Sequence, residues 1–179
     1  MTKTQNGSNH LIALEKRKQA TKDGWKEWIK DQKVKYFLTI TERESKFIRK
    51  AKAQKQATIQ RFNELLYFVN SSLFRKRFSR GEEFLDGFFV VETQANGQPH
   101  VHCLIKNDLP FDSLLNAFRK QLDPKVRGDT KFKSLSMEGF NLQEVEQTEE
   151  SYERLTQYLL KENAEFSPMG PDGFQMAMC

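Results

Sequence analysis

The chain has 179 residues, of which 37% are hydrophobic and 30% charged, and its formal net charge is +5 at pH 7. This length and composition predict one folded domain with a hydrophobic core and exclude a disordered chain. No apolar run approaches the ~20 residues that cross a bilayer, so we expect no membrane partner. With two cysteines, no CxxC motif and no hydrophobic signal core after Met1, we expect a cytoplasmic protein without a disulfide framework.

The first 30 residues are rich in lysine and carry Trp25 and Trp28 three positions apart. This spacing predicts a polar leader that continues into a short amphipathic helix. The two tryptophans either dock this helix or contact DNA directly. We expect residues 1–30 to form this helical leader, residues 31–165 the main domain and residues 166–179 an irregular C-terminal tail.

The first half of the main domain alternates between strand-like and helix-like segments. Residues 36–41 and 88–93 are rich in β-branched and aromatic residues, which predicts two strands. Residues 45–74 contain no glycine or proline and place apolar side chains at helical spacing. We therefore expect one long helix between the two strands.

The second half begins with a predicted hairpin. Residues 99–105 form the third expected strand, and the Asn-Gly pair in the preceding loop favours a tight turn. Asp112 can cap a helix that runs to about Leu122. A further strand is expected near residues 140–145, and Thr148 offers helix-start chemistry for a last helix over about residues 150–163.

The resulting element order is β-α-β-β-α-β-α. It predicts an α+β fold, with a central antiparallel β-sheet of the ferredoxin-like or RRM-like kind and helices packed on one of its faces. The other face would remain available for a functional site.

Two histidines stand two residues apart in the third expected strand. His100 and His102 therefore project from one face, with Val101 turned into the core. If the Asn-Gly pair lies at the turn, Glu92 sits opposite or nearly opposite one of them, and cross-strand Cβ atoms lie ~4.5–5.5 Å apart. Glu92, His100 and His102 are thus candidate metal ligands. The alternative is a pair of histidines that only make hydrogen bonds.

Two imidazoles and one carboxylate would leave coordination positions open for phosphate oxygens and water. Such a mixed nitrogen and oxygen set favours Mn²⁺ or Mg²⁺ when catalysis needs a Lewis acid on phosphate. Ligand type alone also allows zinc.

The last expected helix carries a tyrosine and a lysine on one face, because Tyr158 and Lys161 are three residues apart. A phenol is a poor nucleophile at its usual pKa of about 10, and a nearby cation would favour the phenolate. Tyr158 is therefore the candidate nucleophile and Lys161 a candidate phosphate-binding residue. Tyr152 is the reserve candidate, on a different face of the helix. The alternative is an ordinary amphipathic helix with a half-buried tyrosine and a solvated lysine.

Three segments, in this order, resemble one known family. They are Phe37-Leu38-Thr39-Ile40-Thr41, Glu92 followed by His100-Val101-His102, and Tyr158-Leu159-Leu160-Lys161. Together they resemble the three motifs of HUH endonucleases, and in particular those of the single-tyrosine replication initiators (Rep proteins) of rolling-circle plasmids, phages and small single-stranded DNA viruses.

This resemblance implies an antiparallel sheet with ligands on its central strands and a metal-dependent, site-specific nicking-joining endonuclease. It implies that His100, His102 and Glu92 bind the divalent ion, that Tyr158 attacks the scissile phosphate and that Lys161 helps to hold it. The product would be a 5′-phosphotyrosyl link and a free 3′-hydroxyl that primes replication. The implied partner is single-stranded DNA at a replication origin.

Some features depart from the fuller family pattern. The sequence has no GxxxxGK[ST] phosphate loop, so we expect either a nuclease-only initiator, a fragment, or a member that relies on a host or separate helicase. Relaxases usually have a three-histidine cluster and an N-terminal tyrosine, which this chain lacks. Transposases that share the HUH pair and single tyrosine remain an alternative, as do a relaxase and a non-catalytic nucleic-acid-binding module.

Basic residues offer contacts to the DNA backbone. One cluster lies between the long helix and the second expected strand, and the other in a loop after residue 123. The candidate DNA-binding residues are Arg75, Lys76, Arg77, Arg80, Lys131 and Lys133. Phe74 and Phe78, which lie beside the first cluster, either stack on unpaired bases or belong to the core.

Overall fold

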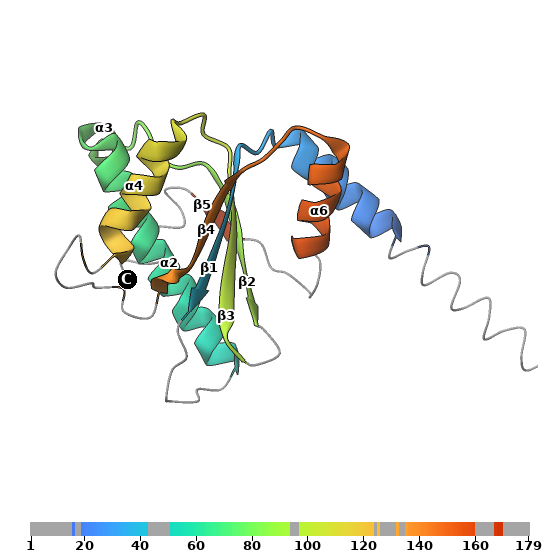
Figure 1. Cartoon of the computed structure of the whole chain (residues 1–179), viewed down its shortest axis with the longest axis horizontal. Coiled ribbons are helices and arrows are strands. Elements are labelled where there is room, and N and C mark those ends of the chain that lie inside the picture. The colour runs from blue at the N-terminus through green and yellow to red at the C-terminus, as the bar shows by residue number, and fades with distance from the viewer. Residues whose placement is uncertain are drawn as a thin grey trace, which may run out of the picture. The chain divides into compact units, whose positions relative to one another are not determined.

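The computed structural model describes residues 16, 19–42, 51–93, 97–123, 125, 132, 135–159 and 167–169. These residues contain a five-stranded antiparallel sheet in the order β4-β1-β3-β2-β5 (Figure 1). The strands are β1 (Tyr36–Glu42), β2 (Gly87–Thr93), β3 (Pro99–Ile105), β4 (Leu135–Glu144) and β5 (Ser167–Met169). The predicted α+β fold with a central antiparallel sheet is confirmed.

Four labelled helices accompany the sheet: α2 (Ala51–Phe74), α3 (Lys76–Ser79), α4 (Phe111–Leu122) and α6 (Glu149–Leu159). Residues 19–31 form a further helix in the predicted leader. The chain divides into two compact units. One contains residues 1–33 and 146–161, and the other contains residues 34–145 and 162–179. Thus α6 groups with the N-terminal helix, whereas the predicted main domain had included it with the sheet.

The hydrophobic core lies between the sheet and two helices. Both α2 and α4 pack on the same face of the sheet (Figure 1). Leu38, Ile40 and Val101 point to this face and meet Phe62 of α2 and Phe118 of α4 in one buried cluster. The alternation of strand residues explains the arrangement, because every second side chain of β1 and β3 faces these helices. The residues between them, including the two histidines, face the other way.

A buried asparagine joins α2 to the start of β2. The side chain of Asn70 donates to the carbonyl of Leu66 and accepts from the backbone N–H of Leu85, at 2.7 and 2.6 Å. Since Asn70 is fully buried, both bonds satisfy groups that have no access to water. They fix where the chain leaves α2 and turns into the hairpin.

Three expectations differ from the structure. The helix α4 begins at Phe111 with Pro110 before it, so Asp112 lies inside the first turn and does not cap the helix. Strand β4 is longer than predicted and begins at Leu135. The predicted irregular tail contains β5, which pairs with the Gly87–Phe89 part of β2. No helix in the described part of the chain is long and apolar enough to span a membrane.

Candidate metal centre and tyrosine helix

The β2–β3 hairpin places Glu92 directly opposite His100, and Val90 opposite His102. Gly97, at the end of the connecting loop, has a φ of 82°, a conformation that glycine adopts without strain. Val101 is 1% exposed and lies in the core, as predicted. The register therefore puts both imidazoles and the carboxylate on the same face of the sheet.

The Glu92 side chain contacts the farther of the two histidines. Its Oε2 atom lies 3.2 Å from Nε2 of His102. The rings of His100 and His102 lie side by side, with centroids 6.1 Å apart. Among the described residues, no three or more His, Cys, Asp and Glu side chains form a group that could hold a metal ion. The structure thus brings two of the predicted ligands into contact and leaves the third beside them.

Both histidines are also held from the neighbouring strand. The hydroxyl of Thr39 lies 3.0 Å from Nδ1 of His102, and the hydroxyl of Thr41 lies 3.4 Å from Nδ1 of His100. Phe37 stacks on the His102 ring with a centroid distance of 5.6 Å. These contacts come from the motif of β1, whose part in the site the sequence alone did not indicate.

Two polar atoms of the site are buried without a hydrogen-bond partner among the described residues. They are Nε2 of His100 and Oε1 of Glu92. A buried polar atom that lacks a partner is costly, and both atoms are of the kind that binds divalent transition metals. The donor chemistry therefore fits a divalent cation held by His100, His102 and Glu92.

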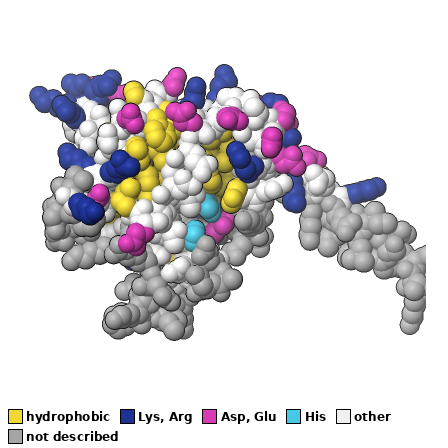
Figure 2. Space-filling view, in the orientation of Figure 1, with side chains coloured by type: hydrophobic (Ala, Val, Ile, Leu, Met, Phe, Trp, Pro, Cys, Tyr) yellow, Lys and Arg dark blue, Asp and Glu magenta, His cyan; other side chains and the backbone are white. Residues whose placement is uncertain are grey.

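The electrostatics of His100 suit a neutral imidazole. Burial lowers the pKa of His100 below its usual value, and the neighbouring His102 lowers it further, while Glu92 raises it. A ring that stays neutral keeps a lone pair available for a metal. Figure 2 shows histidine atoms at the surface of this face, next to acidic ones.

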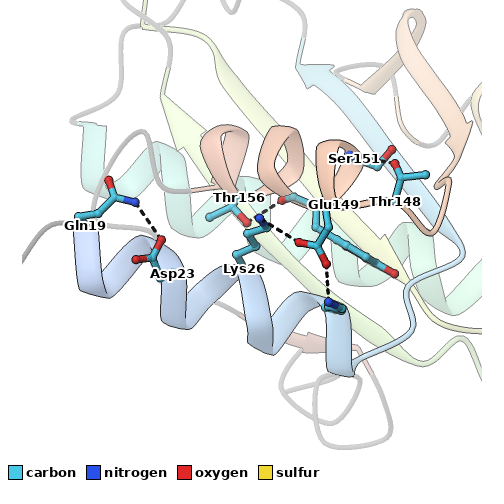
Figure 3. Close-up of polar contacts among 9 residues, drawn as sticks. Gln19, Asp23, Lys26, Thr148, Glu149, Ser151 and Thr156 are labelled. Atoms are coloured by element: carbon cyan, nitrogen blue, oxygen red, sulfur yellow. Dashed lines mark hydrogen bonds and ion pairs between the residues drawn. The ribbon is translucent and has the colours of Figure 1, made fainter.

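The tyrosine helix belongs to the other compact unit. It begins as predicted at Thr148, whose hydroxyl accepts from the backbone N–H of Ser151 at 3.2 Å (Figure 3). Glu149, in the first turn of α6, pairs with Lys26 and Lys30 of the N-terminal helix. The two lysines lower the pKa of the Glu149 carboxyl, and the carboxylate raises both lysine pKa values.

The two tyrosines of α6 have different surroundings. Tyr158 is 40% exposed, whereas Tyr152 is 4% exposed and donates from its hydroxyl to Oε1 of Gln147 at 2.7 Å. The prediction that they occupy different faces is confirmed. Of the pair, Tyr158 is the one whose phenol can reach a substrate. Lys161, Lys131 and Lys133 lie outside the described residues.

The four other candidate DNA-binding residues are all exposed around α3. Arg77 pairs with Glu83 and Arg80 with Glu82, each at 2.7 Å. No ion pair of Arg75 or Lys76 occurs within the described part of the chain. The two paired arginines are therefore partly neutralised by acidic neighbours, which the sequence pattern did not indicate.

This basic cluster and the histidines occupy opposite ends of the sheet. Helix α2 has 24 residues, a length of about 36 Å, and α3 follows its C-terminal end. The chain then enters β2 at Gly87, opposite Ile105, while Glu92 and His100 pair near the other end of the same strands. Figure 2 shows lysine and arginine side chains gathered over the region where Figure 1 draws α3, away from the histidines.

The aromatic residues beside this cluster belong to the protein interior. Phe74 is 4% exposed and is part of the core, so it cannot stack on a base. Phe78 packs against the core and lies edge-on to Tyr67, with centroids 5.3 Å apart. Tyr67 itself is 37% exposed. Of the two interpretations of the phenylalanines, the core interpretation is confirmed for Phe74.

The model of a family of replication-associated proteins, the replication-associated protein ORF2 family, matches residues 35–163. The chain belongs to this family. The match covers most of the chain, including β1, the β2–β3 hairpin and α6, and it supports a role in DNA replication. Searches of curated proteins and of solved structures each found no match.

Proposed function

We propose that this replication-associated protein is a metal-dependent endonuclease of the HUH type, with a single nucleophilic tyrosine. It nicks and rejoins single-stranded DNA at one site in a replication origin and so initiates rolling-circle replication. The observation that carries the proposal is the pair of unpartnered buried atoms, His100 Nε2 and Glu92 Oε1, beside the contact between His102 and Glu92. These donors suit a divalent cation better than they suit one another.

The metal ligands in this proposal are His100, His102 and Glu92. A divalent ion, Mn²⁺ or Mg²⁺, would polarise the scissile phosphate and offset the charge that develops on it. Neutral imidazoles are needed for this, and the lowered pKa of His100 favours the neutral ring. Zinc is the alternative ion for the same ligands.

The nucleophile in this proposal is Tyr158. Its phenolic oxygen attacks phosphorus, the bond from phosphorus to the 3′-oxygen breaks, and the phenolic proton is lost while the 3′-oxygen gains one. The products are a 5′-phosphotyrosyl link and a 3′-hydroxyl, and attack by a 3′-hydroxyl on the link rejoins the strand. The exposure of Tyr158 and the burial of Tyr152 support this assignment. Lys161 would hold the phosphate, as the resemblance implies.

The deciding experiment uses the full chain with fluorescent single-stranded oligonucleotides that cover a candidate origin, in Mn²⁺ and in EDTA. We expect a band on a denaturing gel that carries both protein and label, in Mn²⁺ only. Tyr158→Phe should abolish this adduct and retain DNA binding, whereas Tyr152→Phe should still form it. An adduct that survives Tyr158→Phe and disappears in Tyr152→Phe would move the nucleophile to Tyr152.

A second candidate function is a non-catalytic module that binds single-stranded DNA. The direct contact between His102 and Glu92 favours it, because the two side chains satisfy each other without a metal. This function predicts no adduct with any oligonucleotide or metal, and single-strand affinity that is unchanged in the double variant His100→Ala/His102→Ala.

A further inference from the structure

We propose that Thr39 and Thr41 are positioning residues, which set the ring orientation and the tautomer of His102 and His100 so that both present Nε2 to a divalent ion. This inference rests on the metal centre of the proposed function. It gives a role to the Phe37-Leu38-Thr39-Ile40-Thr41 segment of β1.

The sheet register carries the first step of the argument. Strand β1 lies next to β3, and Thr39 is the partner of His102 while Thr41 is the partner of His100. Each hydroxyl meets the Nδ1 atom of the histidine opposite, at 3.0 and 3.4 Å. Two threonines at the same spacing thus face two histidines at the same spacing, one hydroxyl for each ring.

The chemistry of imidazole carries the second step. A neutral ring has one N–H and one lone pair, and a partner at one nitrogen decides which atom carries the proton. A hydroxyl that accepts from Nδ1–H leaves the lone pair on Nε2, where a metal can bind it. Ligand histidines are commonly oriented in this way by a hydrogen bond at their other nitrogen.

His102 explains why a hydroxyl is suited to this task. Without a metal, Nε2 lies 3.2 Å from the Glu92 carboxylate and would carry the proton, so Nδ1 must accept from Thr39. With a metal on Nε2, the proton moves to Nδ1 and Thr39 must accept. A hydroxyl can donate or accept, so Thr39 can serve both states without moving its heavy atoms.

The seat of Thr41 is built into the neighbouring edge strand. The pairing of β1 with β4 is irregular between Ile40 and Glu42, which is where Thr41 lies. Gly139 faces this position, and a Cβ atom there would lie 2.5 Å from Cβ of Thr41 and 3.0 Å from its hydroxyl. The missing side chain makes room for Thr41 beside His100. Irregular pairing of this kind often serves to aim a side chain next to a site.

The first test needs no metal and no activity. Ring-nitrogen NMR spectra of the three histidines are compared at a pH where all are neutral, for wild type, Thr39→Val and Thr39→Ser. Valine keeps the shape and removes the hydroxyl, while serine keeps the hydroxyl. We expect Thr39→Val to shift the ring-nitrogen signals of His102 and Thr39→Ser to restore them. The matching Thr41 variants should do the same for His100.

The second test measures the affinity for Mn²⁺ by titration calorimetry. We expect each valine variant to bind Mn²⁺ about 10–100-fold more weakly than wild type, the range for loss of a partner that orients a metal ligand. The serine variants should stay within a few-fold of wild type. Thermal unfolding of the metal-free variants separates loss of orientation from loss of fold.

The outcomes separate this inference from the function on which it rests. Valine variants with wild-type Mn²⁺ affinity, or with unchanged histidine signals, overturn the positioning role and leave the metal centre intact. A wild-type protein that binds no Mn²⁺ refutes the metal centre itself, and the positioning role with it.

Discussion

The carboxylate of Glu92 lies 3.2 Å from Nε2 of His102, although the sheet register places Glu92 directly opposite His100. The contact is therefore diagonal across the β2–β3 pair, within the reach of a long side chain on one face of a sheet. A carboxylate that is opposite one histidine and in contact with the other is well placed to share a cation with both.

The first prediction concerns this carboxylate. Glu92→Gln keeps the shape of the side chain and removes its charge, so we expect Mn²⁺ affinity to fall by at least about tenfold, since interactions with a charged group contribute roughly 1.5–3 kcal/mol. Titration calorimetry measures the loss. Glu82→Gln, which alters an exposed acid paired with Arg80, is the control and should bind as wild type does. Equal affinity in Glu92→Gln would remove Glu92 from the ligands.

The second prediction concerns the close approach of Gly139 to Thr41. Gly139→Ala should lower the free energy of unfolding by about 1–3 kcal/mol, the usual cost of an added carbon in a packed site. At Gly24, in the N-terminal helix, an added Cβ atom would have nothing within 4 Å, and Gly24→Ala should stabilise by about 0.5–1 kcal/mol. Urea unfolding of both variants checks the opposite signs. Equal effects would contradict the crowding at Gly139.

The third prediction concerns a buried ion pair at the end of β1. Glu42 is 5% exposed, pairs with Arg61 of α2 and accepts from the Thr58 hydroxyl. Arg61→Met leaves the buried carboxylate without its partner, and we expect a loss of about 3 kcal/mol, the lower end of the range because Arg61 is part-exposed.

The matched double variant Glu42→Gln/Arg61→Met removes both charges. It should be less destabilised than the sum of the two single variants, because neither charge is then left alone. Chemical denaturation of the four proteins gives the coupling. Strictly additive losses would show that the pair does not act as a unit.

The fourth prediction separates the two halves of the basic cluster. Arg77 and Arg80 already pair with glutamates, so we expect Arg75→Ala/Lys76→Ala to weaken single-strand binding more than Arg77→Ala/Arg80→Ala. Each lost phosphate contact should reduce the slope of log affinity against log salt by roughly 0.7. Fluorescence anisotropy over a salt series measures both effects. Slopes that match wild type in both variants would remove the cluster from the DNA-binding surface.

The fifth prediction is a pH dependence in metal-free protein. The pKa of His100 is lowered on folding, so the unfolded chain binds a proton first as the pH falls. Stability from this group is complete above the unfolded pKa of about 6.5 and is lost as the pH falls from there through the folded value. Urea unfolding in EDTA at pH 7.5 and 5.5 should show a smaller difference for His100→Gln than for wild type. An unchanged difference would contradict this assignment.

Much of the sheet could be predicted because its signals are local. Strand β3 matches its predicted bounds, and β1 and β2 match theirs to within one residue. The Asn-Gly turn set the hairpin register, and that register was enough to place Glu92 on the same face as His100 and His102. The different faces of Tyr152 and Tyr158 followed from helical spacing alone.

The parts that could not be predicted depend on contacts between distant segments. Thr39 is 63 residues from His102, and their contact arises from the pairing of β1 with β3. The need for Gly139 arises from the pairing of β4 with β1. Phe74 was ambiguous because a phenylalanine beside basic residues has the same sequence pattern in a core and at a DNA surface. Strand β5 has three residues and contains a proline, so it gives no periodic signal.

The short length of β5 gives the predicted ligands unequal freedom. Strand β3 lies between β1 and β2 along its length, so His100 and His102 have backbones held from both sides. In the described residues β5 pairs only with Gly87–Phe89, so the part of β2 that carries Glu92 is paired through β3 alone. Two fixed imidazoles and one compliant carboxylate can adapt to ions of different radius, because the carboxylate can follow the ion while the imidazoles keep their places.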